Sequence, residues 1–320
     1  MELKKINQEI PISYWQCLLL DVKSRMKHLL ETETMGDCEF LVGKEPTPER
    51  IIAHKFVLSV ASPVFETMFY GSLADKKNEA IRILDIGVDD FKKMMTYIYT
   101  DKTEIGSLTE AMNIYCAGHK YLLTGLRAEC RAYMKANIKA DNACVIYEFS
   151  KFYEESDLMS ECLTMMRKQT SAVITSNGFL DSDLNTVITI LNQNELSVPS
   201  EIDLFKAVKQ YAARNGISRA EQKYVKKVKK DGPTILDALH RIRFRVIADS
   251  NELAREFLGT ELLTKSEVAT ILLCVSLKEA KHYVMPEGFS SSLNPRINPN
   301  VAKSSYNRAY GHNCPTCGRY

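Results

Sequence analysis

The sequence lacks any long apolar run. Its 320 residues contain no stretch that approaches about 18 consecutive apolar residues, the length that a membrane-spanning helix needs. The opening segment MELKKINQEI holds no apolar core followed by small residues at a cleavage site, so the sequence predicts no secretory signal. We therefore expect no membrane among the partners of this chain.

The sequence also has little excess charge of either sign. The 42 lysines and arginines nearly balance the 40 aspartates and glutamates, for a net charge of +2. Proteins that bind nucleic acid or an anionic membrane concentrate positive charge, so neither partner is predicted. A hydrophobic share of 45% is typical of a soluble globular protein, and the length predicts about two domains.

Motifs that carry catalysis are missing as well. The chain has no Gly-rich phosphate loop, no metalloprotease helix and no nucleophile elbow. Cys314 and Cys317, with His312 before them, have the spacing of half a tetrahedral zinc site. One such pair is incomplete, and a disordered tail is the simpler interpretation. We predict no enzyme activity, no cofactor and no metal, with Cys314 and Cys317 as weak candidates.

Cysteine usage indicates a reducing compartment. The count of nine is odd, and seven cysteines stand singly, mostly among apolar neighbours where a reduced thiol acts as a small hydrophobe. We therefore expect a cytosolic or nuclear protein. A lysine cluster could serve nuclear import or bind phosphate, although such runs are usually one solvated helix face, which is the favoured interpretation. The cluster comprises Lys223, Lys226, Lys227, Lys229 and Lys230.

The sequence predicts a segment that combines strands and helices, followed by a segment of helices alone. Helical spacing is expected over 14–30, with Trp15, Leu18, Leu19 and Val22 on the apolar face. Ser62 followed by Pro63 is typical of a helix start, and that helix is expected to stop before Gly71. The other predicted elements are strands at 38–42, 51–53 and 80–84 and helices at 55–61, 91–99 and from Ser107 through Leu122 and beyond.

Strand signals largely vanish after Asn137. Helical patterns cover 141–152, 158–170, 184–191, 201–214, 234–244, 251–258 and 265–277. From about Pro286 the composition shifts to Ser, Asn, Pro, Gly and Tyr without periodicity, which predicts a disordered tail. The expected organisation is an N-terminal tail at 1–13, a mixed domain at 14–136, a helical domain at 137–285 and a disordered tail at 286–320.

The mixed domain resembles the BTB/POZ family. The motif AHKFVLS at 53–59 is followed by SPVF at 62–65 and MFYG at 68–71, with DCEFLVG at 37–43 before them and MTYIYT at 95–100 after. The helical half is similar to the BACK domain at NAC 142–144, NGF 177–179 and SEIDLFKAV 200–208. The resemblance implies an α+β fold: a short β-sheet surrounded by helices, followed by an all-α domain. His54 lies within the signature and is expected to be a structural histidine.

The resemblance to the BTBD group of cullin-3 adaptors also implies contacts. In that family the first helix packs across a twofold axis, which assigns Trp15, Leu18, Leu19 and Val22 to a dimer interface. Asp37 and Lys55 match a charged pocket at the same interface. The alternatives are that the helix covers its own sheet and that Asp37 and Lys55 are solvated. Leu73, Ala74 and Asp75, flanked by Phe69, match the loop that contacts the cullin, although Asp75 is shorter than the usual Glu.

Two functions remain open at this stage. The first is a non-enzymatic dimeric adaptor for a cullin-3-type ubiquitin ligase that brings an unknown protein substrate to it. The second is a cullin-independent interaction protein, either a transcriptional co-regulator or a shortened competitor that heterodimerises with full-length relatives. Relatives usually continue into a PHR domain, for which the residues after 285 are too few, and no MATH or kelch domain is expected.

Overall fold

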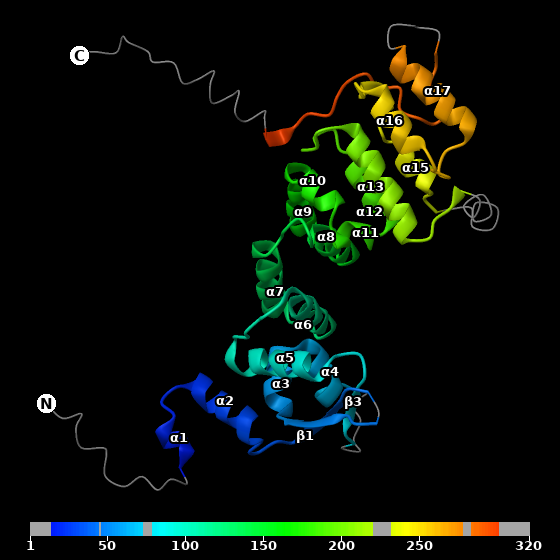
Figure 1. The fold of residues 1–320 in the computed structure, drawn as a ribbon. Coiled ribbons are helices and arrows are strands. Elements are labelled where there is room, and N and C mark those ends of the chain that lie inside the picture. Colours follow the sequence, from blue (N-terminus) through cyan, green and yellow to red (C-terminus); the bar gives the residue numbers. More distant parts are fainter. Residues whose placement is uncertain (1–13, 45, 73–78, 220–231, 278–282, 301–320) are drawn as a thin grey trace, which may run out of the picture. The chain divides into compact units, whose positions relative to one another are not determined.

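The computed structural model describes residues 14–44, 46–72, 79–219, 232–277 and 283–300 (Figure 1). The chain divides into two units, Met1–Asn137 and Ile138–Tyr320. The first unit combines a small sheet with helices, and the second is helical apart from a single bridge between Glu195 and Ile297 in its described part. The predicted α+β class is confirmed. No helix in the described ranges is long and apolar enough to cross a membrane.

The sheet of the first unit has three strands in the order β2-β1-β3. β1 (Cys38–Val42) pairs antiparallel with β2 (Glu49–Ala53) and parallel with β3 (Ile81–Ile83). All three strands were predicted from sequence, and β1 has the predicted bounds. The helices of this unit are α1 (Trp15–Leu18), α2 (Val22–Thr32), α3 (Lys55–Ala61), α4 (Pro63–Tyr70), α5 (Val88–Thr100), α6 (Leu108–Lys120) and α7 (Thr124–Ala136).

Aromatic rings form the centre of this first unit. Phe40 on β1 lies 5.3 Å from Phe91 and 6.0 Å from Phe65, measured between ring centroids. Phe65 in turn stacks on Tyr121 at 4.3 Å. All four side chains are fully buried. Burial of each ring removes a large apolar area from water, so these contacts hold α4, α5 and the end of α6 against the sheet.

The single helix predicted over 14–30 is wrong. The chain forms α1, leaves the helical conformation at Leu19, and restarts as α2 at Val22. Asp21 accounts for the break, because its Oδ1 accepts the backbone N–H of Ser24 at 2.8 Å and caps the new helix. An apolar pattern of helical period does not reveal a cap in its middle when the pattern continues on both sides.

The second unit is a stack of helices. Its aromatic core includes Phe205, which lies 5.1 Å from Phe257 and 5.8 Å from Phe244. The helices are α8 (Ala143–Phe152), α9 (Ser156–Lys168), α10 (Thr170–Ile174), α11 (Asn177–Leu180), α12 (Leu184–Leu191), α13 (Glu201–Arg214), α15 (Ile235–Leu239), α16 (Ser250–Phe257) and α17 (Lys265–Ser276), with the 3-10 turn η1 (Phe244–Val246).

The prediction of a disordered tail from residue 286 is wrong for residues 286–300. Phe289 is buried, with its ring 4.6 Å from the His240 ring. Ile297 accepts the N–H of Leu196 and donates to the carbonyl of Asn194, both at 3.0 Å. We call residues 286–300 the strap. Polar contacts with residues far away in sequence order the strap, and composition alone does not show them.

Candidate functional site

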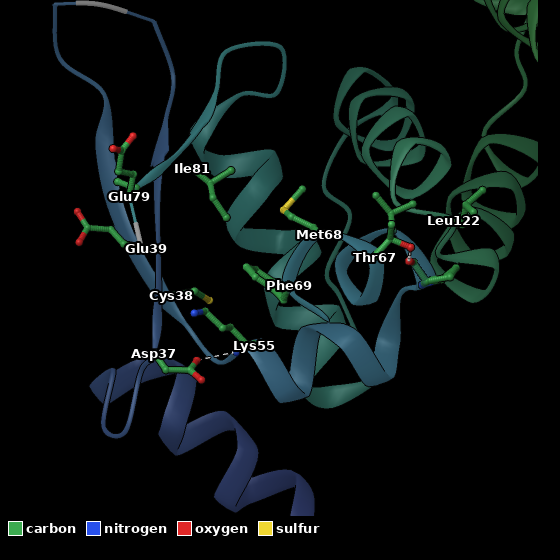
Figure 2. Close-up of a pocket in the computed structure, with 13 residues that line it drawn as sticks. Asp37, Cys38, Glu39, Lys55, Thr67, Met68, Phe69, Glu79, Ile81 and Leu122 are labelled. Carbon is green, nitrogen blue, oxygen red and sulfur yellow. Dashed lines mark hydrogen bonds between the residues drawn. The ribbon is translucent and has the colours of Figure 1, made fainter. Parts of the chain in front are cut away.

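A groove of about 800 Å³ opens between β1, the start of β3, α4 and the end of α6 (Figure 2). Several residues from the family signature line it, from the motifs at 37–43, 53–59, 62–65 and 68–71. The lining residues are Asp37, Cys38, Glu39, Lys55, Pro63, Val64, Thr67, Met68, Phe69, Glu79, Ala80, Ile81 and Leu122. Its volume is within the range of cavities that take a drug-sized ligand or the side chains of a protein partner.

Ser62 sets the position of the α4 wall of this groove. Its Oγ accepts the N–H groups of Val64 and Phe65, at 3.2 and 3.3 Å, and donates to the carbonyl of Tyr121 at 2.6 Å. Pro63 occupies the first helical position, where its missing N–H costs nothing. The predicted cap is therefore confirmed, and it also ties α4 to the end of α6.

Asp37, Lys55 and Phe69 lie at one end of the groove. Asp37 Oδ1 accepts the backbone N–H of Lys55 at 2.7 Å, so this carboxylate caps the first turn of α3. The Lys55 ammonium lies 6.0 Å from the centroid of the Phe69 ring. Sequence reasoning gave these residues two separate roles, in a dimer interface and in a cullin contact. The structure brings them together on one surface.

Cys38 lines the same end of the groove. Burial raises the pKa of its thiol to about 12, with a smaller contribution from the charge of Asp37. Since the thiolate is the reactive form of cysteine, this side chain is a poor nucleophile and a poor metal ligand at neutral pH. The groove is therefore suited to binding and not to thiol chemistry.

Leu122 lines the groove from the end of α6, and sequence reasoning missed it. Its N–H donates to the carbonyl of His119, and the N–H of Leu123 donates to that of Gly118. These two bonds define a Schellman motif, in which Leu122 holds the left-handed position with φ of 55°. Glycine is the usual residue there, because a side chain in this conformation costs about 1–2 kcal/mol. The signal that could have found Leu122 is a large apolar residue directly after a helix end.

Several predicted site residues lie outside the described residues. These are Leu73, Ala74, Asp75, Cys314 and Cys317, together with His312 and the lysine cluster. The segment 73–78 joins Ser72 to Glu79, and Glu79 is itself a lining residue of the groove. Among the described residues, no group of three or more His, Cys, Asp or Glu side chains could hold a metal ion.

The first unit also exposes apolar side chains on its opening segment and on α3. No residue of α1 or α2 is buried, although α2 packs against α5. Trp15 is partly covered because its ring lies 4.5 Å from His28. On α3, Phe56 and Val60 are 70% and 73% exposed and lie one turn apart. We call Leu18, Leu20, Val22, Phe56 and Val60 the apolar face.

His54 has a structural environment. Its Nε2 lies 2.7 Å from the carbonyl of Thr34, which can only accept, so Nε2 carries the proton. Nδ1 then accepts from the Tyr99 hydroxyl at 2.7 Å, and that oxygen also accepts the backbone N–H of His54 at 3.0 Å. Both ring nitrogens are thus used to connect β2, α5 and the turn after α2.

Two family models match this chain. Residues 26–138 match the model described as BTB/POZ domain, and residues 143–250 match the model described as BTB And C-terminal Kelch, or BACK. Proteins with these domains typically act as non-enzymatic adaptors that interact with other proteins. The resemblance inferred from the sequence motifs is confirmed.

Similar curated proteins carry the same kind of name. BTB/POZ domain-containing protein 3 of Homo sapiens is 35% identical over 206 residues, which is 64% of this chain and 39% of that protein. BTB/POZ domain-containing protein 6-A of Danio rerio is 31% identical over 271 residues, which is 83% of this chain and 48% of that protein. The chain thus spans less than half the length of these relatives.

Proposed function

Because this chain carries a BTB/POZ domain followed by a BACK domain, we propose that it is a dimeric adaptor for a cullin-3-type ubiquitin ligase. Each BTB unit binds one cullin scaffold, and the chain brings an unidentified protein substrate to the ligase. No bond is made or broken by the adaptor. Its effect is a higher effective concentration of the substrate near the ligase.

The position of one predicted contact residue, Phe69, supports the cullin contact. Phe69 lines the groove, and the segment that holds Leu73, Ala74 and Asp75 ends at the lining residue Glu79. An apolar side chain beside a carboxylate suits a partner that offers an apolar pocket with a polar rim. The groove carries such a mixture in its own lining, from Phe69 and Met68 to Glu39 and Glu79.

The opening of the BACK unit offers a further apolar contact for the same partner. Phe152, at the end of α8, is 78% exposed, and Val145 two turns earlier is exposed as well. Phe149 lies between them on the helix, with its ring 4.8 Å from Tyr153. Exposed aromatic side chains of this kind are typical of binding surfaces, since water contact with them is unfavourable.

The apolar face supports dimerisation. Phe56, Val60 and the exposed residues of α1 and α2 cover no sheet of their own chain, which disfavours the alternative that the opening helix serves only its own core. Two copies that join through this face would remove these side chains from water. Asp37 and Lys55 line the groove, so in this proposal they contact the docked protein and not the second subunit.

Binding to the purified N-terminal domain of cullin-3 tests the proposal. Titration calorimetry with the full chain should give a dissociation constant on the order of micromolar or lower. The double variant Leu73→Ala, Asp75→Ala should abolish it. The control variant Leu258→Ala, Glu261→Ala removes an exposed leucine and an acid from the BACK unit and should bind normally. A wild-type dimer that does not bind would refute the ligase role and favour a cullin-independent interaction protein.

A further inference from the structure

We propose that Leu122 is a specificity contact of the groove, and that its side chain enters an apolar site on the protein that docks there. This inference rests on the proposed cullin-3-type partner. The backbone conformation of Leu122, the exposure of its side chain and its place in the groove lead to it together.

Leu122 occupies the left-handed position of the Schellman motif, where glycine has no steric penalty and leucine has one. The motif itself does not need this side chain. Its usual apolar contact comes from the following residue, and Leu123 is 4% exposed here. A leucine at position 122 therefore works against the local conformation without helping to close the helix.

A leucine in an unfavourable conformation can still stabilise a fold when its side chain fills the core. Leu122 is 51% exposed, so much of this side chain gains no burial within its own chain. The fold does not require a leucine at this strained position, and Leu122 lines the groove. Backbone strain of this kind is typical of functional sites.

Figure 2 shows Leu122 and Asp37 at opposite ends of the residues that line the groove. The end near Asp37 carries Glu39, Lys55 and Glu79, whereas Leu122 shares the lining with the uncharged residues Pro63, Val64, Thr67 and Met68 from α4. The groove thus has a charged end and an uncharged end. A partner that fits it carries a large aliphatic or aromatic side chain at the Leu122 end and polar groups at the other.

The variant Leu122→Gly separates this role from a structural one, because the two effects have opposite signs. Glycine removes the steric penalty of the left-handed backbone, so the urea midpoint of unfolding of the full chain should rise or stay unchanged. Loss of the contact should weaken binding to the cullin-3 N-terminal domain by tenfold or more in calorimetry. Leu122→Asn, which tolerates the left-handed conformation but has no apolar side chain, should weaken binding in the same way.

Met35 supplies the matched control. It is the other apolar residue with a left-handed backbone among the described residues, with φ of 62°, and it is exposed but does not line the groove. Met35→Gly should leave affinity unchanged. If the wild type binds and Leu122→Gly binds equally well, the role of Leu122 is refuted while the proposed function stands. If the wild type itself does not bind, the proposed function fails and this inference fails with it.

Discussion

Arg296 forms a buried ion pair with Glu201, a residue 95 positions earlier in the chain. Its Nε lies 2.7 Å from Oε1 of Glu201, and the two side chains are only 3% and 5% exposed. The guanidinium also donates to the carbonyls of Leu191 and Arg241, both at 2.8 Å, and to that of Gln193. Arg296 therefore joins the strap to the end of α12, the start of α13 and the turn after α15.

Replacement of Arg296 should destabilise the second unit. In Arg296→Met the carboxylate of Glu201 stays buried without its partner, and three carbonyls lose a donor. We expect a loss of about 3–5 kcal/mol in the free energy of unfolding. Amide hydrogen exchange of α12 and α13 measures this within the full chain, where the two units need not unfold together.

The control for this variant is Arg241→Met, which removes an exposed guanidinium from the same region. It should change the exchange rates little. Equal protection of α12 and α13 in Arg296→Met and in the wild type would contradict the view that the strap is part of the BACK unit.

Ser62 should be more sensitive to substitution than other helix caps of the first unit. Ser62→Ala removes three hydrogen bonds and leaves the carbonyl of Tyr121 without this donor. We expect a loss of about 2 kcal/mol in the free energy of unfolding, measured by urea titration with circular dichroism. Ser107→Ala removes a single exposed cap bond, to the N–H of Glu110, and should lose about 1 kcal/mol or less. The reverse order would show that Ser62 does not anchor the groove wall.

Glu267 should make α17 sensitive to acid. Burial by itself raises the pKa of this carboxyl, but hydrogen bonds from Arg219 and Thr264 outweigh burial and hold the pKa below its ordinary value of 4.5. A carboxyl with a lowered folded-state pKa stabilises the fold fully above its unfolded pKa. That contribution disappears as the pH falls through the folded pKa. The stability of α17 should therefore decline below a pH of about 4.5.

Hydrogen exchange of α17 between about pH 6 and about pH 3 tests this with Glu267→Gln. Glutamine keeps the shape of the side chain but has no carboxyl group that titrates. The amides of α17 in this variant should therefore be less protected from exchange at neutral pH, and their protection should change less with acid. Glu261→Gln, at an exposed position before the same helix, should behave as the wild type. A steep acid dependence that persists in Glu267→Gln would assign the effect to another group.

The apolar face predicts a change in oligomeric state without a change in folding. The variant Phe56→Glu, Val60→Glu places two charges on α3 where both side chains are already exposed in the single chain. Loss of this burial should weaken self-association by about 3 kcal/mol, or more than 100-fold. Sedimentation velocity should show a monomer with an unchanged circular dichroism spectrum. Leu84→Glu, at an exposed leucine just after β3, should remain dimeric.

Local patterns in the sequence predicted the elements of the fold well. The bounds of β1, α3, α12 and α13 agree with the apolar periodicity, and the predicted cap at Ser62 opens α4. These elements form where neighbouring residues alone specify the backbone. The family motifs added the order of the two domains, which composition and periodicity do not show.

Features that depend on distant contacts were not predictable. The strap has the composition of a disordered tail, and its order depends on Arg296 and Glu201, which are far apart in sequence. Phe56 and Val60 have the hydrophobicity of core residues, and only the structure shows that they face outward. Leu122 follows a helix without a glycine signal, so its left-handed backbone was not apparent.

Light scattering of the wild-type chain tests the central claim most directly, because a dimeric platform requires two copies to associate through the apolar face. At micromolar concentration the account predicts a mass of twice 36.3 kDa, and addition of the cullin-3 N-terminal domain should increase it by two copies of that domain. A well-folded species at 36.3 kDa, unchanged at higher concentration, would contradict the account.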